Sequence, residues 1–134
     1  MPVATVGETA THEVRITDET IDAFAERSGD TNPIHLDDGY AADTMFDGRV
    51  AHGILSAAVV SAALASLPGD IVYLSQDLSF ESPVRPGETI RANVEVVEAI
   101  GGDRIRVNTE AFVPARDERV VDGEATVLSV PHEP

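Results

Sequence analysis

One apolar segment restricts the possible folds of this chain more than any other feature. Residues 53–67 (GILSAAVVSAALASL) are apolar on almost every helical face, and a helix of this kind is normally buried. At 15 residues the segment is shorter than the ~20 that a membrane-spanning helix needs. Its many Ala and Ser residues indicate that other elements approach it closely. The rest of the chain is therefore predicted to wrap around this helix.

Alternating apolar residues after this helix predict a series of β-strands. Residues 71–80, 88–98, 104–113 and 119–130 have this pattern, and Gly- or Pro-containing turns separate them. In the first strand, Val72, Leu74, Leu78 and Phe80 are expected to share one face. Short connections imply an antiparallel sheet, and residues 11–17 have the pattern of a further strand. An antiparallel sheet curved around one apolar helix is an α+β fold, and 134 residues fit a single domain, 1–134.

The charge balance is strongly acidic. The chain has 24 acidic and 9 basic residues, all of the latter Arg, for a formal net charge of -15. Such a charge repels nucleic acids and anionic membranes, so neither is an expected partner. The acidic residues are spread along the chain, which favours adaptation to molar intracellular salt, with a Debye length of ~3 Å, over an acidic partner-binding face. We therefore expect a halophilic source and a fold that weakens at low salt.

The absence of Cys excludes disulfides, thiolate nucleophiles and Cys-ligated zinc. The first residues have neither the basic start nor the apolar stretch of a signal peptide. These features agree with a cytoplasmic protein, which is the expected location.

The segment SGDTNPIH (residues 28–35) places an Asp, an Asn and a His close together in the sequence. Apolar residues at helical spacing predict a helix over residues 18–28, which Gly29 is suited to end. Pro33 disfavours the α conformation at Asn32, so Asp30 and His35 are predicted to flank a tight, non-helical turn. A second short helix is expected over residues 36–46, with its N-cap at Asp37 or Asp38.

Residues 24–61 resemble the signature of the MaoC-like, or (R)-specific enoyl-CoA hydratase, family. The matching pattern is Ser-Gly-Asp-x-Asn-Pro-Ile-His, followed by Ala-His-Gly and an apolar helix, and the likeness continues through SPVRPGETI. The resemblance implies a hot-dog fold, in which an antiparallel sheet wraps around one central helix, and a homodimer. It also implies reversible addition of water to a trans-2-enoyl-CoA, giving (R)-3-hydroxyacyl-CoA, in fatty acid metabolism or in polyhydroxyalkanoate precursor supply.

Carried over by position, the resemblance assigns the catalytic pair to Asp30 and His35. Asn32 and Pro33 would support the loop that holds this pair. The backbone N–H of Gly53, at the start of the central helix, would face the thioester oxygen of the substrate.

The implied chemistry suits these residue types. Hydration needs a base that activates water at C3 and an acid that protonates C2, and a carboxylate and an imidazole that hold one water can supply both. A backbone N–H at a helix N-terminus can stabilise the charge that develops on the thioester oxygen. No metal or cofactor is required, because coenzyme A is part of the substrate. The sequence leaves open which of Asp30 and His35 is the base and which is the acid.

Each of these residues also has a purely structural interpretation. Asp30 could cap a turn, and Asn32 could serve only the loop shape. Ser61 matches a serine near the active site of some family members, but a serine in such a helix often bonds back to a carbonyl. His52 is expected to orient the loop rather than to react.

Rival functions also remain open. A 3-hydroxyacyl-ACP dehydratase-type enzyme would run the same chemistry on an acyl-carrier protein. A non-catalytic acyl-CoA-binding hot-dog subunit is expected to lose Asp30 or His35, and this chain keeps both. A hot-dog thioesterase is disfavoured because the central helix has no acidic residue. If the ligand is an acyl-CoA thioester, some arginines should face its phosphates, and the candidates by position are Arg49, Arg85, Arg91, Arg104 and Arg106.

Overall fold

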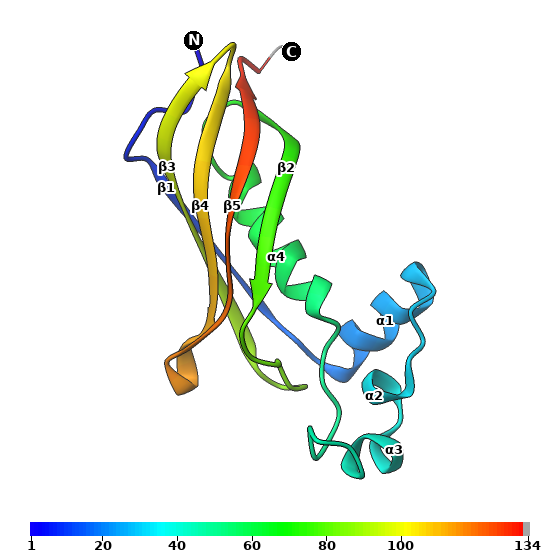
Figure 1. The fold of residues 1–134 in the computed structure, drawn as a ribbon. Helices are drawn as coiled ribbons and strands as arrows, with labels where there is room; N and C mark the ends of the chain where they lie inside the picture. The colour runs from blue at the N-terminus through cyan, green and yellow to red at the C-terminus, as the bar shows by residue number, and fades with distance from the viewer. Residues whose placement is uncertain (133–134) are drawn as a thin grey trace.

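A five-stranded antiparallel sheet curves around one helix in the computed structural model, which describes residues 1–132 (Figure 1). The helix is α4 (Gly53–Ala65), and it packs on the inner face of the sheet. The strands are β1 (Thr9–Arg15), β2 (Asp70–Phe80), β3 (Thr89–Gly101), β4 (Arg104–Val113) and β5 (Glu118–Val130). Their order is β1-β3-β4-β5-β2, so β1 and β2 form the two edges. This arrangement confirms the predicted α+β, hot-dog fold.

The core lies between α4 and the inner face of the sheet. Alternate side chains of β4, from Ile105 to Val113, are fully buried, as the pattern of apolar residues predicted. The alternation in β3 between Ile90 and Val96 is also confirmed. Helix α4 contributes small side chains such as Ala63, so that the strands pack closely against it.

Strand β2 departs from the predicted alternation. Its pairing with β5 shifts between Tyr73 and Ser75, which leaves Leu74 as the extra residue of a β-bulge. Before the bulge, Tyr73 lies opposite the buried Val127, so Tyr73 faces inward and Val72 faces outward. The expectation that Val72 shares a face with the apolar residues after the bulge was therefore wrong, because one extra residue reverses the alternation.

Three helices lie to one side of the lower end of the sheet in Figure 1, and the first of them adds the buried Ile21 to the core. They are α1 (Asp18–Ser28), α2 (Pro33–Leu36) and α3 (Asp38–Ala42). Thr17 caps α1 by accepting a hydrogen bond from the Thr20 N–H at 3.1 Å. Gly29 ends α1 in the left-handed conformation (φ 82°), as predicted.

The structure corrects the predicted turn between Asp30 and His35. Asn32 is non-helical (φ -56°, ψ 128°), as the proline after it requires, but helix α2 begins at Pro33 itself. Proline suits the first position of a helix, because the N–H that it lacks would have no helical acceptor there. His35 therefore lies within a short helix. Two predicted ends also move, since α3 stops at Ala42 and α4 stops at Ala65.

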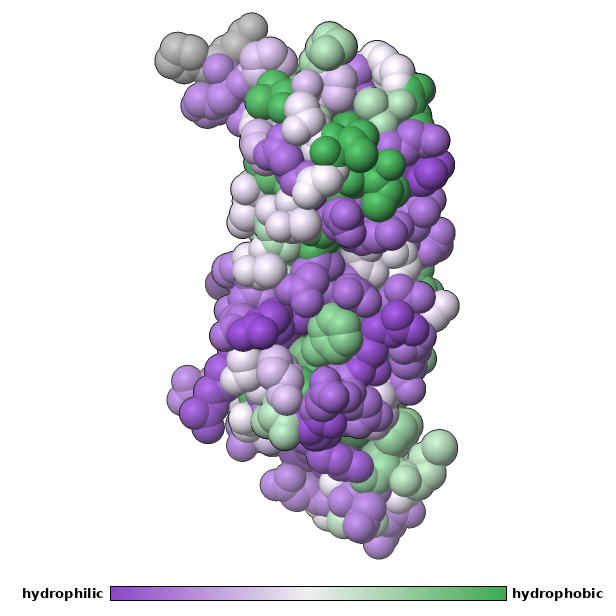
Figure 2. All heavy atoms as spheres, turned by 90° about the vertical axis from the view of Figure 1, so that its left-hand side faces the viewer, coloured by the Kyte–Doolittle hydropathy of each residue, from purple (hydrophilic) through white to green (hydrophobic). Residues whose placement is uncertain are grey.

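The surface is mainly hydrophilic on the side that Figure 2 shows, and hydrophobic side chains gather mostly near its upper end. Within residues 1–132, five arginines pair with carboxylates, namely Arg49, Arg91, Arg106, Arg116 and Arg119. Across the described residues, no helix combines the length and the hydropathy that a bilayer crossing would need.

Candidate active site

Helix α2 holds His35, a residue that is only 8% exposed. The Nδ1 atom of the ring lies 2.8 Å from the carbonyl oxygen of Val50. A carbonyl only accepts, so Nδ1 carries the proton and donates it. The other ring nitrogen, Nε2, is then the atom through which His35 can exchange a proton with a ligand.

Asp30 follows the end of α1 and is held mainly by neighbours in the sequence. Its N–H donates to Ser28 Oγ at 3.1 Å, and its Oδ1 accepts a long hydrogen bond from the Asn32 N–H at 3.4 Å. The side chain of Asn32 in turn accepts from the Ile34 N–H at 3.3 Å and caps α2. These contacts fit the predicted loop-supporting role of Asn32, and they leave the second carboxylate oxygen of the exposed Asp30 available.

The fold brings Asp30, His35 and His52 together. Each offers one oxygen or nitrogen atom, and the three atoms lie within 4.8 Å of one another. One water that bonds two such atoms at ~2.8 Å each can bridge a gap of up to ~5.6 Å, so the carboxylate and the imidazole are close enough to share a single water. These side chains are also metal-ligand types, but the two imidazole rings are stacked, and stacked rings do not direct their nitrogen lone pairs at one ion. The arrangement suits a shared water better than a metal.

His52 precedes α4 and is buried beside this pair, with 2% of its surface exposed. Its ring stacks on that of His35, with centroids 3.9 Å apart and planes 29° apart. The ring of Phe24 meets it edge-on at 4.8 Å. The Nε2 atom of His52 lies 2.9 Å from the backbone carbonyl oxygen of Asp30. His52 therefore touches both predicted catalytic residues, as expected of a residue that orients the loop.

A hollow of about 360 Å³ opens beside His35 and the start of α4. Gly53 lines it, and the Gly53 N–H has no backbone acceptor within residues 1–132, as is usual in the first turn of a helix. A Cβ atom at Gly53 would lie 3.2 Å from the ring of Phe80, so a larger residue would crowd the hollow. A free N–H at the positive end of a helix can stabilise negative charge on an oxygen atom.

Sequence reasoning missed Ser56 and Phe80, which also line this hollow. Ser56 is 4% exposed and lies one turn after Gly53, so helical spacing could have indicated it. Phe80 comes from the end of β2, and nothing in its local sequence relates it to α4. Ser61 lies ~12 Å further along the axis of α4 than Gly53, and it is not among the described residues that line the hollow.

Arg49 holds α2 by its backbone, and the sequence did not reveal this role. Its guanidinium donates to the carbonyl oxygen of His35 at 2.6 Å, to Asp18 at 2.8 Å and to Asp22 at 3.0 Å. The side chain is only 9% exposed. These bonds connect α1, α2 and the segment before α4, so Arg49 is occupied by protein groups rather than free for a phosphate.

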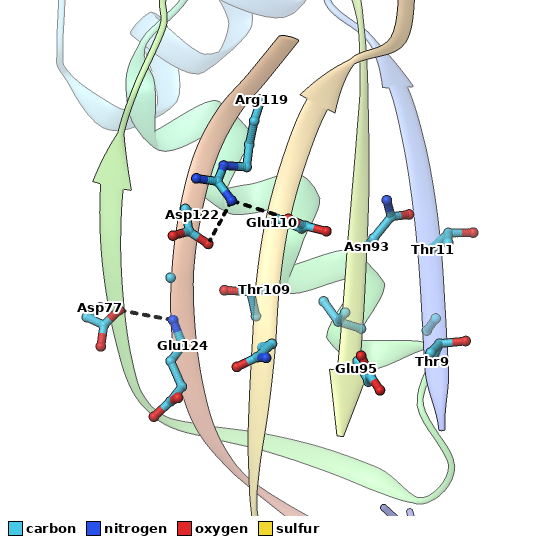
Figure 3. Close-up of a pocket in the computed structure, with 14 residues that line it drawn as sticks. Thr9, Thr11, Asp77, Asn93, Glu95, Thr109, Glu110, Arg119, Asp122 and Glu124 are labelled. Atoms are coloured by element: carbon cyan, nitrogen blue, oxygen red, sulfur yellow. Dashed lines mark hydrogen bonds and ion pairs between the residues drawn. The ribbon is translucent and has the colours of Figure 1, made fainter. Parts of the chain in front are cut away.

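A larger hollow, of about 790 Å³, lies on the outer face of the sheet (Figure 3). Arg119 lies 3.7 Å from both Glu110 and Asp122, and it is the one basic side chain in the lining. The acidic side chains there are Asp77, Glu95, Glu110, Asp122 and Glu124. This charge disfavours anionic ligands, and no predicted site residue lies there. Size alone therefore does not locate the site.

Known proteins resemble this chain over most of its length. A family model described as MaoC like domain matches residues 3–115. The 3-hydroxybutyryl-CoA dehydratase of Methylorubrum extorquens is 44% identical over 124 residues, which are 91% of this chain and 78% of that protein. The (R)-specific enoyl-CoA hydratase of Rhodospirillum rubrum is 39% identical over 91% of this chain and 85% of that protein. The R-hydratase PhaJ1 from Pseudomonas aeruginosa, solved in the unliganded form, has a TM-score of 0.88 and 39% identity, and the match covers 98% of this chain and 88% of that one.

Proposed function

Because this chain belongs to the MaoC-like family and is a hydro-lyase of the hydratase/dehydratase type, we propose that it is an (R)-specific enoyl-CoA hydratase. The proposed reaction is the reversible addition of water to a trans-2-enoyl-CoA, which gives (R)-3-hydroxyacyl-CoA. One observation carries the proposal. The Asp30 carboxylate and the His35 imidazole offer atoms within 4.8 Å of each other, and His35 lines a hollow that Gly53 also lines.

In the proposed mechanism, one water bridges the Asp30 carboxylate and Nε2 of His35. One side chain takes a proton from this water as its oxygen bonds to C3 of the substrate. The other side chain must carry a proton when the reaction begins, and it gives this proton to C2, so the pair together neither gains nor loses a proton. General acid–base catalysis of this kind contributes ~10²–10⁴-fold to a rate.

The backbone N–H of Gly53 would donate to the thioester oxygen, where negative charge develops as C3 is attacked. A preorganised donor at a helix N-terminus stabilises this charge without rearranging. Val50, Val84 and Phe80 give the hollow apolar walls that suit an acyl chain. No metal and no cofactor take part in this mechanism, since coenzyme A belongs to the substrate.

Arg85 is the best placed of the candidate arginines for the phosphates of coenzyme A. Its guanidinium donates to the carbonyl oxygen of Phe46, which lines the hollow. Among the ion pairs of the described residues, none involves Arg85 or Arg104, whereas Arg49, Arg91 and Arg106 each pair with a carboxylate. Arg104 starts β4 and does not line the hollow or bond to a residue that does, within the described chain. An arginine without a carboxylate partner keeps its charge available for an anionic ligand.

We also propose a homodimer in which a second copy covers β2 and one face of α4. β2 is an edge strand, and its side chains include Val72, Leu74 and Phe80, each more than 40% exposed. An apolar hollow of about 480 Å³ lies between β2 and α4, next to the exposed Ile54. Burial there raises the pKa of Tyr73 above its ordinary value. Exposed edges with apolar side chains favour pairing with another chain.

Light scattering in molar KCl checks this assembly. We expect the mass of a dimer for the wild type and of a monomer for Leu74→Glu, because a carboxylate would be buried in the interface. Thr11→Glu, on the polar edge strand β1, is the matched control and should remain a dimer. A monomeric wild type, or a dimer that persists in Leu74→Glu, would contradict the proposed interface.

Hydration of crotonyl-CoA, followed as loss of enoyl absorbance in molar KCl, tests the proposed function. We expect activity that survives dialysis against EDTA and a product of (R) configuration by chiral analysis. Inactivity on enoyl-CoA thioesters of several lengths, with activity on the acyl-carrier substrate, would favour the ACP dehydratase instead. Tight acyl-CoA binding without turnover would favour the non-catalytic subunit.

A further inference from the structure

His52 contacts both members of the proposed catalytic pair, and its Nε2 atom bonds to the backbone of Asp30 rather than to either catalytic side chain. We propose that His52 is a positioning residue, whose Nε2–H holds the Asp30 backbone while its ring supports that of His35. This inference rests on the proposed function, because it concerns the same pair. In this proposal His52 affects catalysis by positioning Asp30 and does not itself act on the substrate.

The hydrogen bond to Asp30 defines the state of His52. The acceptor is a backbone carbonyl, so Nε2 must carry the proton, and the neutral ring is then unprotonated at Nδ1. Nδ1 is buried and has no partner among the described residues. One nitrogen is thus bonded to the loop, and the other is buried without a hydrogen-bond partner, so the contacts of His52 fit a positioning role better than proton transfer.

The ring of His52 is held from both sides. Phe24, on α1, meets it edge-on, and His35, on α2, stacks on its face. These packing contacts fix the ring plane, and therefore the direction in which Nε2–H points. The Nδ1 donation of His35 to Val50 fixes the neighbouring ring independently. The ring of His52 is therefore held in a fixed position between α1, α2 and the start of α4.

The position of Asp30 depends on the ring of His52 more than the position of His35 does. Its other hydrogen bonds reach only Ser28 and Asn32, each two residues away in the sequence. The bond to His52 is the one that connects Asp30 to a distant part of the described chain, across 22 positions. Without it, the backbone of Asp30 would be tied only to its own loop. A displacement of ~1 Å at a catalytic group can cost ~10²-fold in rate.

Two variants separate the hydrogen bond from the ring. His52→Gln keeps a donor, because the amide nitrogen of Gln and Nε2 of His are the same number of bonds from Cβ. His52→Phe keeps an aromatic ring beside His35 but removes the donor. If the bond positions Asp30, we expect kcat of His52→Phe to fall by about 30–100-fold with KM changed less than about threefold, and His52→Gln to recover to within about tenfold of the wild type.

A double-mutant cycle with Asp30→Asn measures whether the activity losses of the two substitutions are coupled. A merely structural role of His52 predicts no such coupling. His52→Phe should cost little in the Asp30→Asn background, because the group that it positions has already lost its function. Additive losses in this cycle would overturn the proposal. So would equal losses in His52→Gln and His52→Phe, or an effect on KM alone. Thermal melting of each variant establishes that the molecules compared are folded.

Nuclear magnetic resonance of the imidazole and backbone groups tests the positioning without any turnover. We expect a protected Nε2–H signal for His52, and shifted Asp30 and Asn32 amide signals in His52→Phe but not in His52→Gln. If the wild type lacks hydratase activity while these signals behave as stated, the proposed function fails and the positioning contact stands. If the wild type is active and His52→Phe retains full kcat, the positioning role fails and the proposed function stands.

Discussion

The sheet with α4 and the region of residues 29–52 are ordered by different means. In the sheet, many apolar side chains, such as those of Ile105 and Val107, each contribute a part of one continuous core. In residues 29–52, single polar contacts fix single groups, as Val50 does for His35 and His52 does for Asp30. A substitution in the sheet should therefore act on stability first. One in residues 29–52 should act on activity first.

The largest effect is expected from the pair itself. Asp30→Asn and His35→Ala should each lower kcat/KM for crotonyl-CoA by about 10³-fold or more, because each removes a proton-transfer group. Asp30 is exposed and makes few contacts, so Asp30→Asn should melt within about 2 °C of the wild type. Enzyme kinetics and thermal melting, both in molar KCl, provide the two measurements.

Asp38→Asn is the matched control, since Asp38 is also an exposed acid near the site but lies on α3. Its activity should be close to that of the wild type. Near-normal activity in Asp30→Asn would show that Asp30 is not a catalytic residue. The expectation that substitutions in residues 29–52 act on activity first would then lose its main support.

A core substitution should show the opposite behaviour. Ile105→Ala should lower the free energy of unfolding by about 2–5 kcal/mol, because it leaves a cavity in a fully buried position. The kcat of the molecules that remain folded should be unchanged. Denaturant titration at fixed protein concentration measures the first quantity, and Asn108→Ala, on the outer face of the same strand, should change it by less than about 0.5 kcal/mol. A loss of kcat in folded Ile105→Ala would show that the two regions are coupled.

Arg49 joins α1 to α2, so its loss should affect both stability and activity. Arg49→Met keeps the apolar stem but removes the hydrogen bonds to His35 and to two carboxylates. We expect the free energy of unfolding to fall by about 1–3 kcal/mol, and kcat to fall by about tenfold as His35 loosens. Denaturant titration and steady-state kinetics measure the two effects. Arg27→Met, an exposed residue on α1, is the control, and equal effects in both variants would argue against the role of Arg49.

A change in salt concentration should affect the stability of both regions alike, so it should have the smallest effect on the difference between them. Screening reduces the self-repulsion of a net charge of -15, so the melting temperature should rise between millimolar and molar KCl. Thermal melting followed by circular dichroism across this range checks the halophilic interpretation. A melting temperature that does not change would count against it.

The same contrast explains how much the sequence could predict. The strands β3 and β4 could be predicted from local alternation, and α4 could be predicted because its segment is apolar on almost every face. Pro33 indicated that Asp30 and His35 flank a turn, but their assignment as a catalytic pair came from family resemblance. The helical form of that turn was not predicted, because α2 begins at Pro33 itself. Helical spacing from Gly53 could have predicted that Ser56 lines the hollow. The Arg49 contacts were not, because they depend on how α1 meets α2.

The bulge at Leu74 has a consequence for comparing this chain with its relatives. A relative that lacks the extra residue keeps one unbroken alternation along the whole of β2. An alignment without a gap at this place would then match Val72, which faces outward here, with an inward residue of the relative. Homology models and substitution tables built on such an alignment would give residues 70–73 the wrong solvent exposure, although the percentage identity would barely change.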